Sequence, residues 1–275
     1  MDIVRFEDIK AEIINNMRRQ KLIPIIGSGF TRGCNSLNGT VPSGKEYKEH
    51  MVSAIASVEN ITTNESAALL TRAFSEVSTI YQKIVPINKQ RDFLRDNFTC
   101  VQIDDPQKQS FINIGWPYIY TLNIDDGIEK NSKFSNVVYA NRDVNSEVFT
   151  NSLCVIKLHG DANEILTYRD SVSQIFSQSQ YVRSLKGNSV LLNKLTHDAT
   201  YMNLLYVECS LEGEIDLLAV FNESKSQKIT PPHYYYCTTT RPDKITEILY
   251  AEYGITHTIL FDSYDEMFIA LSSAW

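Results

Sequence analysis

Cysteine is sparse in this sequence, and its spacing excludes two common uses. No C-x-x-C occurs, and the five cysteines lie far apart, at Cys34, Cys100, Cys154, Cys209 and Cys237. Zinc sites built on cysteine need closely spaced pairs. An odd number of widely spaced cysteines is typical of free thiols in a reducing compartment. We therefore expect neither a disulfide framework nor a bound metal.

Long hydrophobic runs and an excess of basic charge are also absent. No apolar run approaches the roughly 18–20 residues that a membrane-spanning helix needs. The N-terminal MDIVRFEDIK lacks the charged-then-apolar pattern of a secretory signal. The 26 basic and 33 acidic residues give a net charge of −7, which argues against a broad nucleic-acid-binding surface. We expect a cytoplasmic protein with no membrane partner and no direct nucleic-acid binding.

The remaining composition is that of a globular α/β protein. Of the 275 residues, 43% are hydrophobic, enough for a sizeable core. Apolar runs predict strands at 21–26, 116–122, 136–139, 153–158, 203–207, 233–237 and 256–261, with helices that include 6–19, 242–252 and 264–272. Alternating strands and helices predict a Rossmann-like, mostly parallel central sheet with helices on both faces.

Residues 35–115 interrupt this alternation and are predicted to be mostly helical. Met51, Ile55 and Val58 form one apolar stripe, and residues 69–77 carry another. We interpret the segment as an insertion that forms a helical layer over the sheet. Because there is no internal repeat and no low-complexity linker, residues 1–275 are expected to form one domain. The end of the chain, just past a helix, would also suit the N-terminal part of a larger protein.

A glycine-rich stretch, KLIPIIGSGFTRG at residues 21–33, is the first candidate site. The apolar run that ends at Gly27 and Gly29 reads as a buried strand entering a tight loop. Glycine tolerates positive φ and lets a ligand approach the backbone, and phosphate oxygens are frequent ligands of such loops. Gly33 lies one residue too far for the dinucleotide fingerprint, so an ordinary strand-to-helix turn is an equal alternative.

Two further motifs follow predicted strands. Asn123 and Asp125 come after the strand at 116–122, and His159 with Gly160 comes after the strand at 153–158. Polar residues at the carboxyl ends of neighbouring parallel strands line a common crevice. Histidine can act as a general base near neutral pH. The ordinary readings are a turn residue for Asn123, a helix N-cap for Asp125 and a structural histidine for His159.

The order and spacing of these motifs, followed by Ser210 after the strand at 203–207, resemble the sirtuin-like (SIR2) superfamily over about residues 21–262. Without cysteine pairs, the chain resembles the zinc-free bacterial anti-phage defence branch. The resemblance implies that His159 contacts the nicotinamide ribose and that Asn123 orients the ribose or the attacking water. The positions that it implies for NAD binding are Gly27, Ser28, Gly29, Phe30, Thr31, Asp125 and Ser210.

Two positions depart from the family pattern. Leu122 stands where a polar Gln or Thr is common, and Glu208 replaces the glycine of the last motif. The carboxylate of Glu208 would either hydrogen-bond ribose hydroxyls or repel the diphosphate, and the sequence leaves both open. Residues 41–44 lie where the family has a flap beside the nicotinamide.

The resemblance implies an NAD+ glycohydrolase that releases nicotinamide and ADP-ribose. It further implies an effector of anti-phage defence that depletes NAD+, as a homo-oligomer or with a partner ATPase or sensor protein. NAD is then a substrate, and no metal is needed. The alternatives are a NAD-dependent protein deacylase or ADP-ribosyltransferase, and a non-catalytic domain that binds NAD or ADP-ribose or mediates assembly.

Overall fold

An eight-stranded sheet runs through the centre of the computed structural model, which describes residues 1–134, 136–140, 153–167, 174–226 and 232–275. The strand order is β1-β8-β7-β6-β2-β3-β5-β4, and each pairing is parallel. The predicted Rossmann-like α/β fold is confirmed, with a sheet that is parallel throughout. The strands are β1 (Asp2–Arg5), β2 (Leu22–Ile26), β3 (Ile119–Thr121), β4 (Asn136–Tyr139), β5 (Cys154–Lys157), β6 (Asn203–Val207), β7 (Tyr234–Thr238) and β8 (His257–Leu260).

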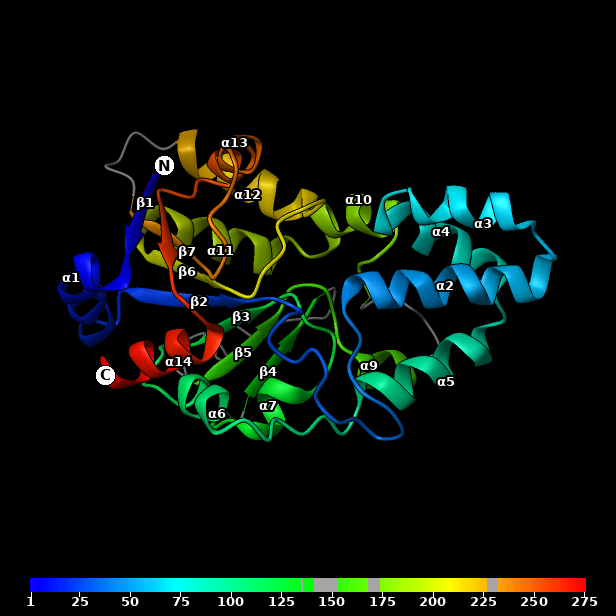
Figure 1. The fold of residues 1–275 in the computed structure, drawn as a ribbon, viewed down its shortest axis with the longest axis horizontal. Coiled ribbons are helices and arrows are strands. Elements are labelled where there is room, and N and C mark those ends of the chain that lie inside the picture. The colour runs from blue at the N-terminus through cyan, green and yellow to red at the C-terminus, as the bar shows by residue number, and fades with distance from the viewer. Residues whose placement is uncertain (135, 141–152, 168–173, 227–231) are drawn as a thin grey trace.

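Helices cover both faces of this sheet (Figure 1). One face packs against α1 (Phe6–Arg18), α6 (Pro106–Ile112), α7 (Gly127–Asn131) and α14 (Tyr264–Ser273). The other face packs against α11 (Ser189–Tyr201), α12 (Ile215–Ser226) and α13 (Lys244–Glu252). Two further helices, α9 (Ala162–Thr167) and α10 (Gln178–Gly187), follow β5 in the chain. None of the described helices is both long enough and apolar enough to cross a membrane.

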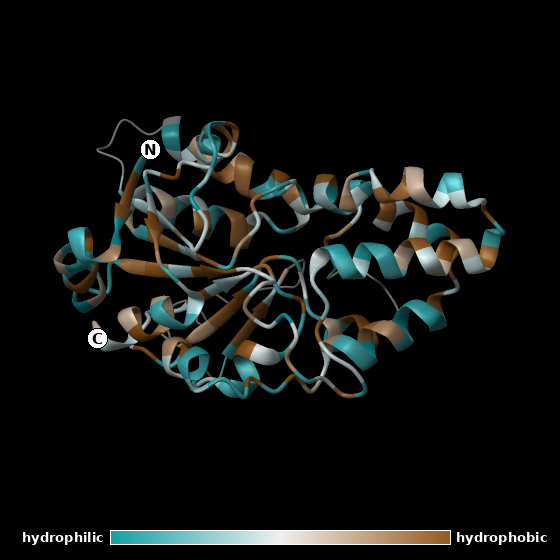
Figure 2. Ribbon diagram, viewed as in Figure 1, coloured by the Kyte–Doolittle hydropathy of each residue, from teal (hydrophilic) through white to brown (hydrophobic). Residues whose placement is uncertain are grey.

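The central strand β2 explains the apolar run in the sequence. All five of its residues are buried, because helices cover both faces of the sheet. Leu22 and Ile26 join the core under α1 and α14, while Ile23 and Ile25 join the core under α11 and α12. This division follows from the alternation of side chains along a strand. Figure 2 shows the result: the central strands are largely hydrophobic, and the helices around them carry many hydrophilic residues.

The predicted insertion, residues 35–115, contains α6, which packs on the sheet, and four further helices: α2 (Gly44–Glu59), α3 (Thr63–Leu70), α4 (Phe74–Ile84) and α5 (Ile87–Phe98). We call these four helices the helical module. Ser43 caps α2, because its hydroxyl accepts from Glu46 N at 3.1 Å while the Glu46 carboxylate accepts from Ser43 N at 2.7 Å. Tyr47 anchors the module core with its ring stacked 5.1 Å from that of Phe93.

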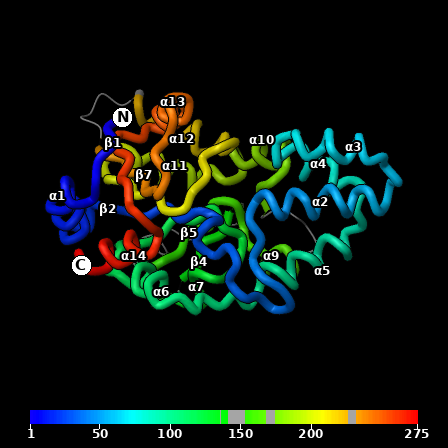
Figure 3. The backbone as a smooth tube through the Cα atoms, in the orientation of Figure 1, coloured from blue at the N-terminus to red at the C-terminus, as the bar shows by residue number. Residues whose placement is uncertain are grey.

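The helical module stands beyond the carboxyl ends of the strands (Figure 1). The predicted helical layer therefore covers the carboxyl ends of the strands, while other helices cover the two faces of the sheet. The trace in Figure 3 shows the blue segment between β2 and α2 that links the sheet to the module. Because ligands of open parallel sheets bind at the carboxyl ends of strands, this position makes the module one wall of any site there.

Candidate functional site

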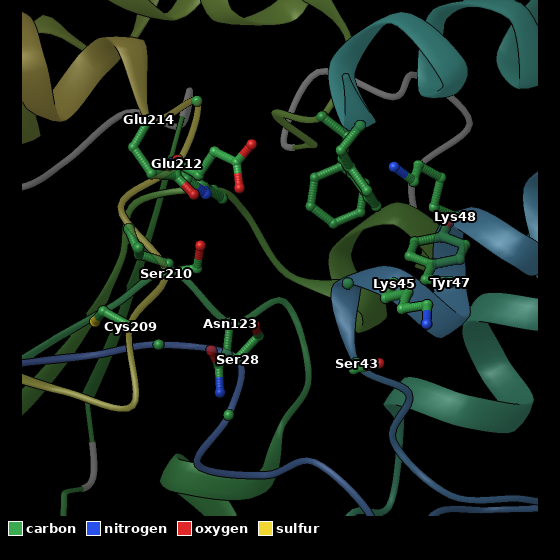
Figure 4. Close-up of a pocket in the computed structure, with 18 of the residues that line it drawn as sticks. Ser28, Ser43, Lys45, Tyr47, Lys48, Asn123, Cys209, Ser210, Glu212 and Glu214 are labelled. Atoms are coloured by element: carbon green, nitrogen blue, oxygen red, sulfur yellow. The ribbon is translucent and has the colours of Figure 1, made fainter. Parts of the chain in front are cut away.

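A pocket of about 820 Å³ lies at the carboxyl ends of β2, β3, β5 and β6, and the helical module lines its far side. Its volume is typical of a small-ligand site, roughly 300–1,000 Å³. The chain leaves β2 for β3 on one side and later returns to β6 on the other side of β2, which makes this point the topological switch of the sheet. Figure 4 shows Ser28, Asn123 and Ser210 facing Lys45 and Lys48 across the pocket.

The glycine loop after β2 lines the pocket, and its glycines allow a close contact inside the protein. A Cβ on Gly27 would lie 2.4 Å from both Cys209 Cα and Glu208 O, and one on Gly29 would lie 3.0 Å from Glu208 O. Neither glycine has a positive φ, whereas Gly33 does (77°). Glycine is therefore needed at the first two positions so that the loops after β2 and β6 can touch.

The backbone N–H groups of this loop are largely engaged within the protein. Gly27 N donates to Val207 O at 3.0 Å, Gly29 N donates to Glu208 O at 3.2 Å, and Phe30 N donates to Gly27 O at 3.1 Å. A phosphate cradle would point these groups at one ligand. Stabilisation of a phosphate's negative charge at this pocket would therefore come from side chains more than from the N–H groups of this loop.

Asn123 is held in one orientation at the floor of the pocket. Its side chain is 3% exposed, and its Nδ2 donates to the Thr31 hydroxyl at 3.0 Å. The Thr31 hydroxyl in turn donates to Asp125 Oδ2 at 2.7 Å. Asn123 Oδ1 is buried and has no hydrogen-bond partner among the described residues. This oxygen is therefore an acceptor that still lacks a donor, in a residue that lines the pocket.

Phe30 and Thr31 lie behind the pocket and are not among the described residues that line it. The Phe30 ring is fully buried, edge-on to Phe268 with 5.5 Å between ring centroids. Thr31 is also fully buried and holds Asn123 and Asp125 together. The other residues proposed to bind NAD line the pocket, namely Gly27, Ser28, Gly29, Asp125 and Ser210.

Asp125 combines a pocket position with a structural contact. Its Oδ1 accepts from Gly127 N at 2.9 Å at the start of α7, as an N-terminal cap would. Burial raises the pKa of Asp125, and the charge of Lys157 opposes this shift. Lys157 is fully buried in β5 and also donates to the backbone oxygens of Ile124 and Asp125. The hydrogen bonds from Lys157 therefore hold the loop that carries Asn123 and Asp125 in place.

His159 lines the pocket two residues after β5, but it is tied to two carboxylates. Its Nε2 lies 3.1 Å from Asp216 Oδ2 and 3.3 Å from Glu214 Oε2. Burial alone would lower the pKa of His159, but the charges of Glu214 and Asp216 outweigh burial and raise it to about 9. At neutral pH the imidazole is therefore protonated and cannot accept a further proton. An imidazole must be neutral to act as a general base, so the predicted role of His159 conflicts with the charge that these two carboxylates give it.

Glu214 and Asp216 are site residues that sequence reasoning missed. Asp216 is fully buried and its Oδ1 accepts from Leu217 N at 2.9 Å, while Glu214 is 15% exposed and accepts from the Tyr181 hydroxyl at 3.0 Å. The available signal was the acidic alternation Glu212, Glu214, Asp216 directly after Ser210. Ligand atoms of His159, Glu214 and Asp216 lie within 4.8 Å of one another, which is close enough for a metal ion, and no other such group occurs among the described residues. The predicted absence of a metal stays a prediction.

Glu208 stands where the family pattern has glycine, and its backbone shows why glycine suits the position. Its φ is 49°, in the left-handed region that side chains rarely adopt. Its side chain is 9% exposed, with Lys108 Nζ 3.5 Å from Oε2. Burial raises the pKa of Glu208, and Lys108 opposes this shift. Glu208 therefore lines the pocket with a carboxylate that is paired with Lys108.

The wall opposite these acidic groups is basic. Arg32 from the segment after β2, Lys45 and Lys48 from α2, and Arg72 after α3 all line the pocket. Lys48 Nζ donates to Arg72 O at 3.2 Å, which joins α2 to the segment that follows α3. Opposite charges on facing walls suit a ligand that carries both anionic and cationic groups.

Comparison with known proteins agrees with this geometry. No curated protein matches the chain. The model of the SIR2-like domain family matches residues 117–258, which is more than half of the chain. The matched part contains Asn123, Asp125, His159 and Ser210, and five of the eight strands, β3 to β7, lie wholly within it. The chain therefore belongs to the SIR2-like domain family, which includes NAD-dependent enzymes.

Proposed function

We propose that the protein is an NAD+ glycohydrolase, which cleaves NAD+ to nicotinamide and ADP-ribose. The observation that carries the proposal is the pocket of a SIR2-like domain in which Asn123, His159 and Glu214 come together, with the buried Asn123 Oδ1 left without a hydrogen-bond donor in the described chain. Leaving a buried acceptor without a donor costs about 1–3 kcal/mol. A ligand rich in donors removes this cost, and NAD+ offers ribose hydroxyls and a carboxamide NH2.

The charges of the pocket fit the two ends of NAD+. The diphosphate is anionic, and the basic wall of Arg32, Lys45, Lys48 and Arg72 supplies cations. The nicotinamide ring is cationic until it leaves, and the ribose then becomes oxocarbenium-like. The acidic groups after β6 favour that positive charge. We propose that the nicotinamide ribose lies near Asn123 and His159, and that the diphosphate lies toward α2.

The test is incubation of purified protein with NAD+, followed by separation of the products. We expect nicotinamide and ADP-ribose in equal amounts. An acetylated-lysine peptide in a parallel reaction separates the alternatives, because a deacylase would release nicotinamide only with the peptide. If NAD+ binds but survives intact with and without peptide, the hydrolase proposal fails and the binding-domain alternative replaces it.

Asn123→Ala separates catalysis from binding. If Asn123 Oδ1 places the attacking water, the variant should lose turnover and keep most of its affinity for NAD+. Calorimetry on the variant measures the affinity directly. Retained turnover, together with a loss of stability of about 1 kcal/mol, would assign Asn123 the ordinary role of a turn residue.

We further propose that the cytoplasm is the place of action and that NAD+ depletion during phage infection is the biological role. The support is the zinc-free SIR2-like resemblance. Bacteria that express the wild-type chain, with its partner genes where these exist, should lose NAD+ and form fewer plaques after infection. A strain with His159→Ala should keep its NAD+, and equal plaque counts in both strains would refute the role.

A further inference from the structure

We propose that Glu214 accepts the proton of the attacking water, and that His159 and Asp216 hold Glu214 in place. This inference rests on the proposed NAD+ hydrolysis and changes which residue performs its proton transfer. The geometry points to Glu214 because it is the most exposed member of the trio. Its side chain is 15% exposed, against 3% for His159 and 0% for Asp216. Figure 4 shows Glu214 at the pocket, on the wall opposite α2.

The contacts of His159 remove it as a proton acceptor. Its Nε2 lies within hydrogen-bonding distance of a carboxylate oxygen on each of Asp216 and Glu214. An imidazole between two carboxylates is stabilised as the cation, in which both ring nitrogens are donors. The cation then balances Asp216, which is fully buried and has further contact only from the Leu217 N–H in the described chain. Glu214 remains as the carboxylate that faces the pocket.

The surroundings of Glu214 tune it for proton transfer near neutral pH. Burial raises the pKa of Glu214, His159 and the Tyr181 hydroxyl lower it, Asp216 raises it, and the resulting pKa is about 7. A general base works best when its pKa lies near the operating pH. The titratable groups that face Glu214 come from several elements and are His159, Tyr181, Cys209, Asp216 and Tyr253.

The reaction balances with these groups alone. The bond between the ribose C1′ and the pyridinium nitrogen breaks, and its electron pair stays on nitrogen, so neutral nicotinamide leaves. The oxygen of water bonds to C1′, and the proton of that water passes to the Glu214 carboxylate and then to solvent. The products are nicotinamide, ADP-ribose and one proton. The positive charge of His159 stays in place throughout, because its pairing with Asp216 is unchanged.

The test compares kcat from pH 5 to 9 for the wild type, Glu214→Gln and Glu212→Gln. Glutamine keeps the shape of Glu214 and an acceptor for Tyr181. We expect Glu214→Gln to lower kcat by roughly 10²–10⁴-fold and to remove the fall in rate at acid pH. Glu212→Gln removes the same charge from the same loop, but no described ion pair joins Glu212 to His159. In Glu212→Gln, the fall in kcat at acid pH should therefore occur at the same pH as in the wild type.

A second readout follows His159 by NMR and needs no turnover. With labelled imidazole, His159 should be charged at pH 7 in the wild type. Its pKa should fall in both Glu214→Gln and Asp216→Asn, because each variant removes a carboxylate at Nε2. A neutral His159 at pH 7 would overturn the inference.

The possible failures are distinguishable. If the wild type does not cleave NAD+, the proposed function fails and the inference fails with it. If the wild type cleaves NAD+ and Glu214→Gln keeps both its rate and its acid limb, the inference alone fails. If EDTA abolishes cleavage and a stoichiometric metal is found, the trio is a metal site, and Glu214 is a ligand instead of a base.

Discussion

Replacing Lys157 with Met should destabilise the protein more than most single changes. Lys157 is fully buried in β5, where its Nζ lies 2.7 Å from Glu129 Oε1 and also pairs with Asp161. It donates as well to the backbone oxygens of Ile124 and Asp125. Burial lowers the pKa of Lys157, but Glu129 and Asp161 outweigh burial and hold it well above its ordinary value. The lysine is therefore charged, and its charge is fully paired.

The magnitude follows from what the substitution leaves behind. Methionine fills a similar volume, so the cavity cost is small. Asp161 is 1% exposed and Glu129 is 12% exposed, and both would lose their buried cation. Removing one partner of a buried ion pair costs about 3–5 kcal/mol. Burial raises the pKa of Glu129 to about 7, so this residue can take up a proton, which keeps the total within that range.

Thermal unfolding measures this effect. For a chain of this size, a loss of about 3–5 kcal/mol lowers Tm by roughly 6–20 °C. Lys244→Met is the matched control, because Lys244 is 82% exposed and pairs with Glu247 at the surface. Exposed ion pairs contribute at most about 1 kcal/mol, so the control should melt close to the wild type. Equal melting of Lys157→Met and Lys244→Met would refute the reasoning.

Three more predictions concern the glycine loop, the charged histidine and the metal. Gly27→Ala should cost about 2–3 kcal/mol, because its Cβ would lie 2.4 Å from the backbone after β6; Gly44→Ala meets nothing within 4 Å and should be harmless in the same urea titration. Folding raises the pKa of His159 from 6.5 to about 9, so its stabilisation is complete below pH 6.5 and is lost by about pH 9. Stability measured against pH should therefore fall less steeply in His159→Gln over this range; an equal slope would contradict the ion pairs. Chelator should change neither Tm nor activity, and stoichiometric metal in the purified protein would contradict this.

The sequence was sufficient for the fold class because the inner strands of a covered parallel sheet appear as apolar runs in the sequence. β2 is buried on both faces and reads as the run LIPII before Gly27. β1 shows no such run, because it is an edge strand of four residues that are half-buried or exposed. The position of the helical module was also beyond the sequence, since an amphipathic helix indicates which of its faces is buried but not what lies against it.

The candidate site was predicted only where a motif joins a strand to its loop. Asn123, Asp125 and His159 could be found because each follows an apolar run. Their roles depend on contacts between distant residues, and local pattern carries no information on these. The proton on His159 is one example, because the pKa of His159 is raised by the carboxylates of Glu214 and Asp216, which follow a different strand. Thr31, which the resemblance places among the NAD-binding residues, is another, because its hydroxyl hydrogen-bonds Asn123 and Asp125.

The basic wall gives the insertion, which has no catalytic motif, a place in the proposed mechanism. Lys45, Lys48 and Arg72 occur on helix surfaces or at helix ends, where charges usually face solvent. The same charges become part of the site because the module stands at the carboxyl ends of the strands. Three N–H groups of the glycine loop already donate to backbone oxygens within the protein. In the proposed function, the diphosphate would therefore need cationic side chains from another part of the chain. The helical module supplies Lys45, Lys48 and Arg72 to the pocket, and in the proposed function the sheet alone would form an incomplete NAD+ site.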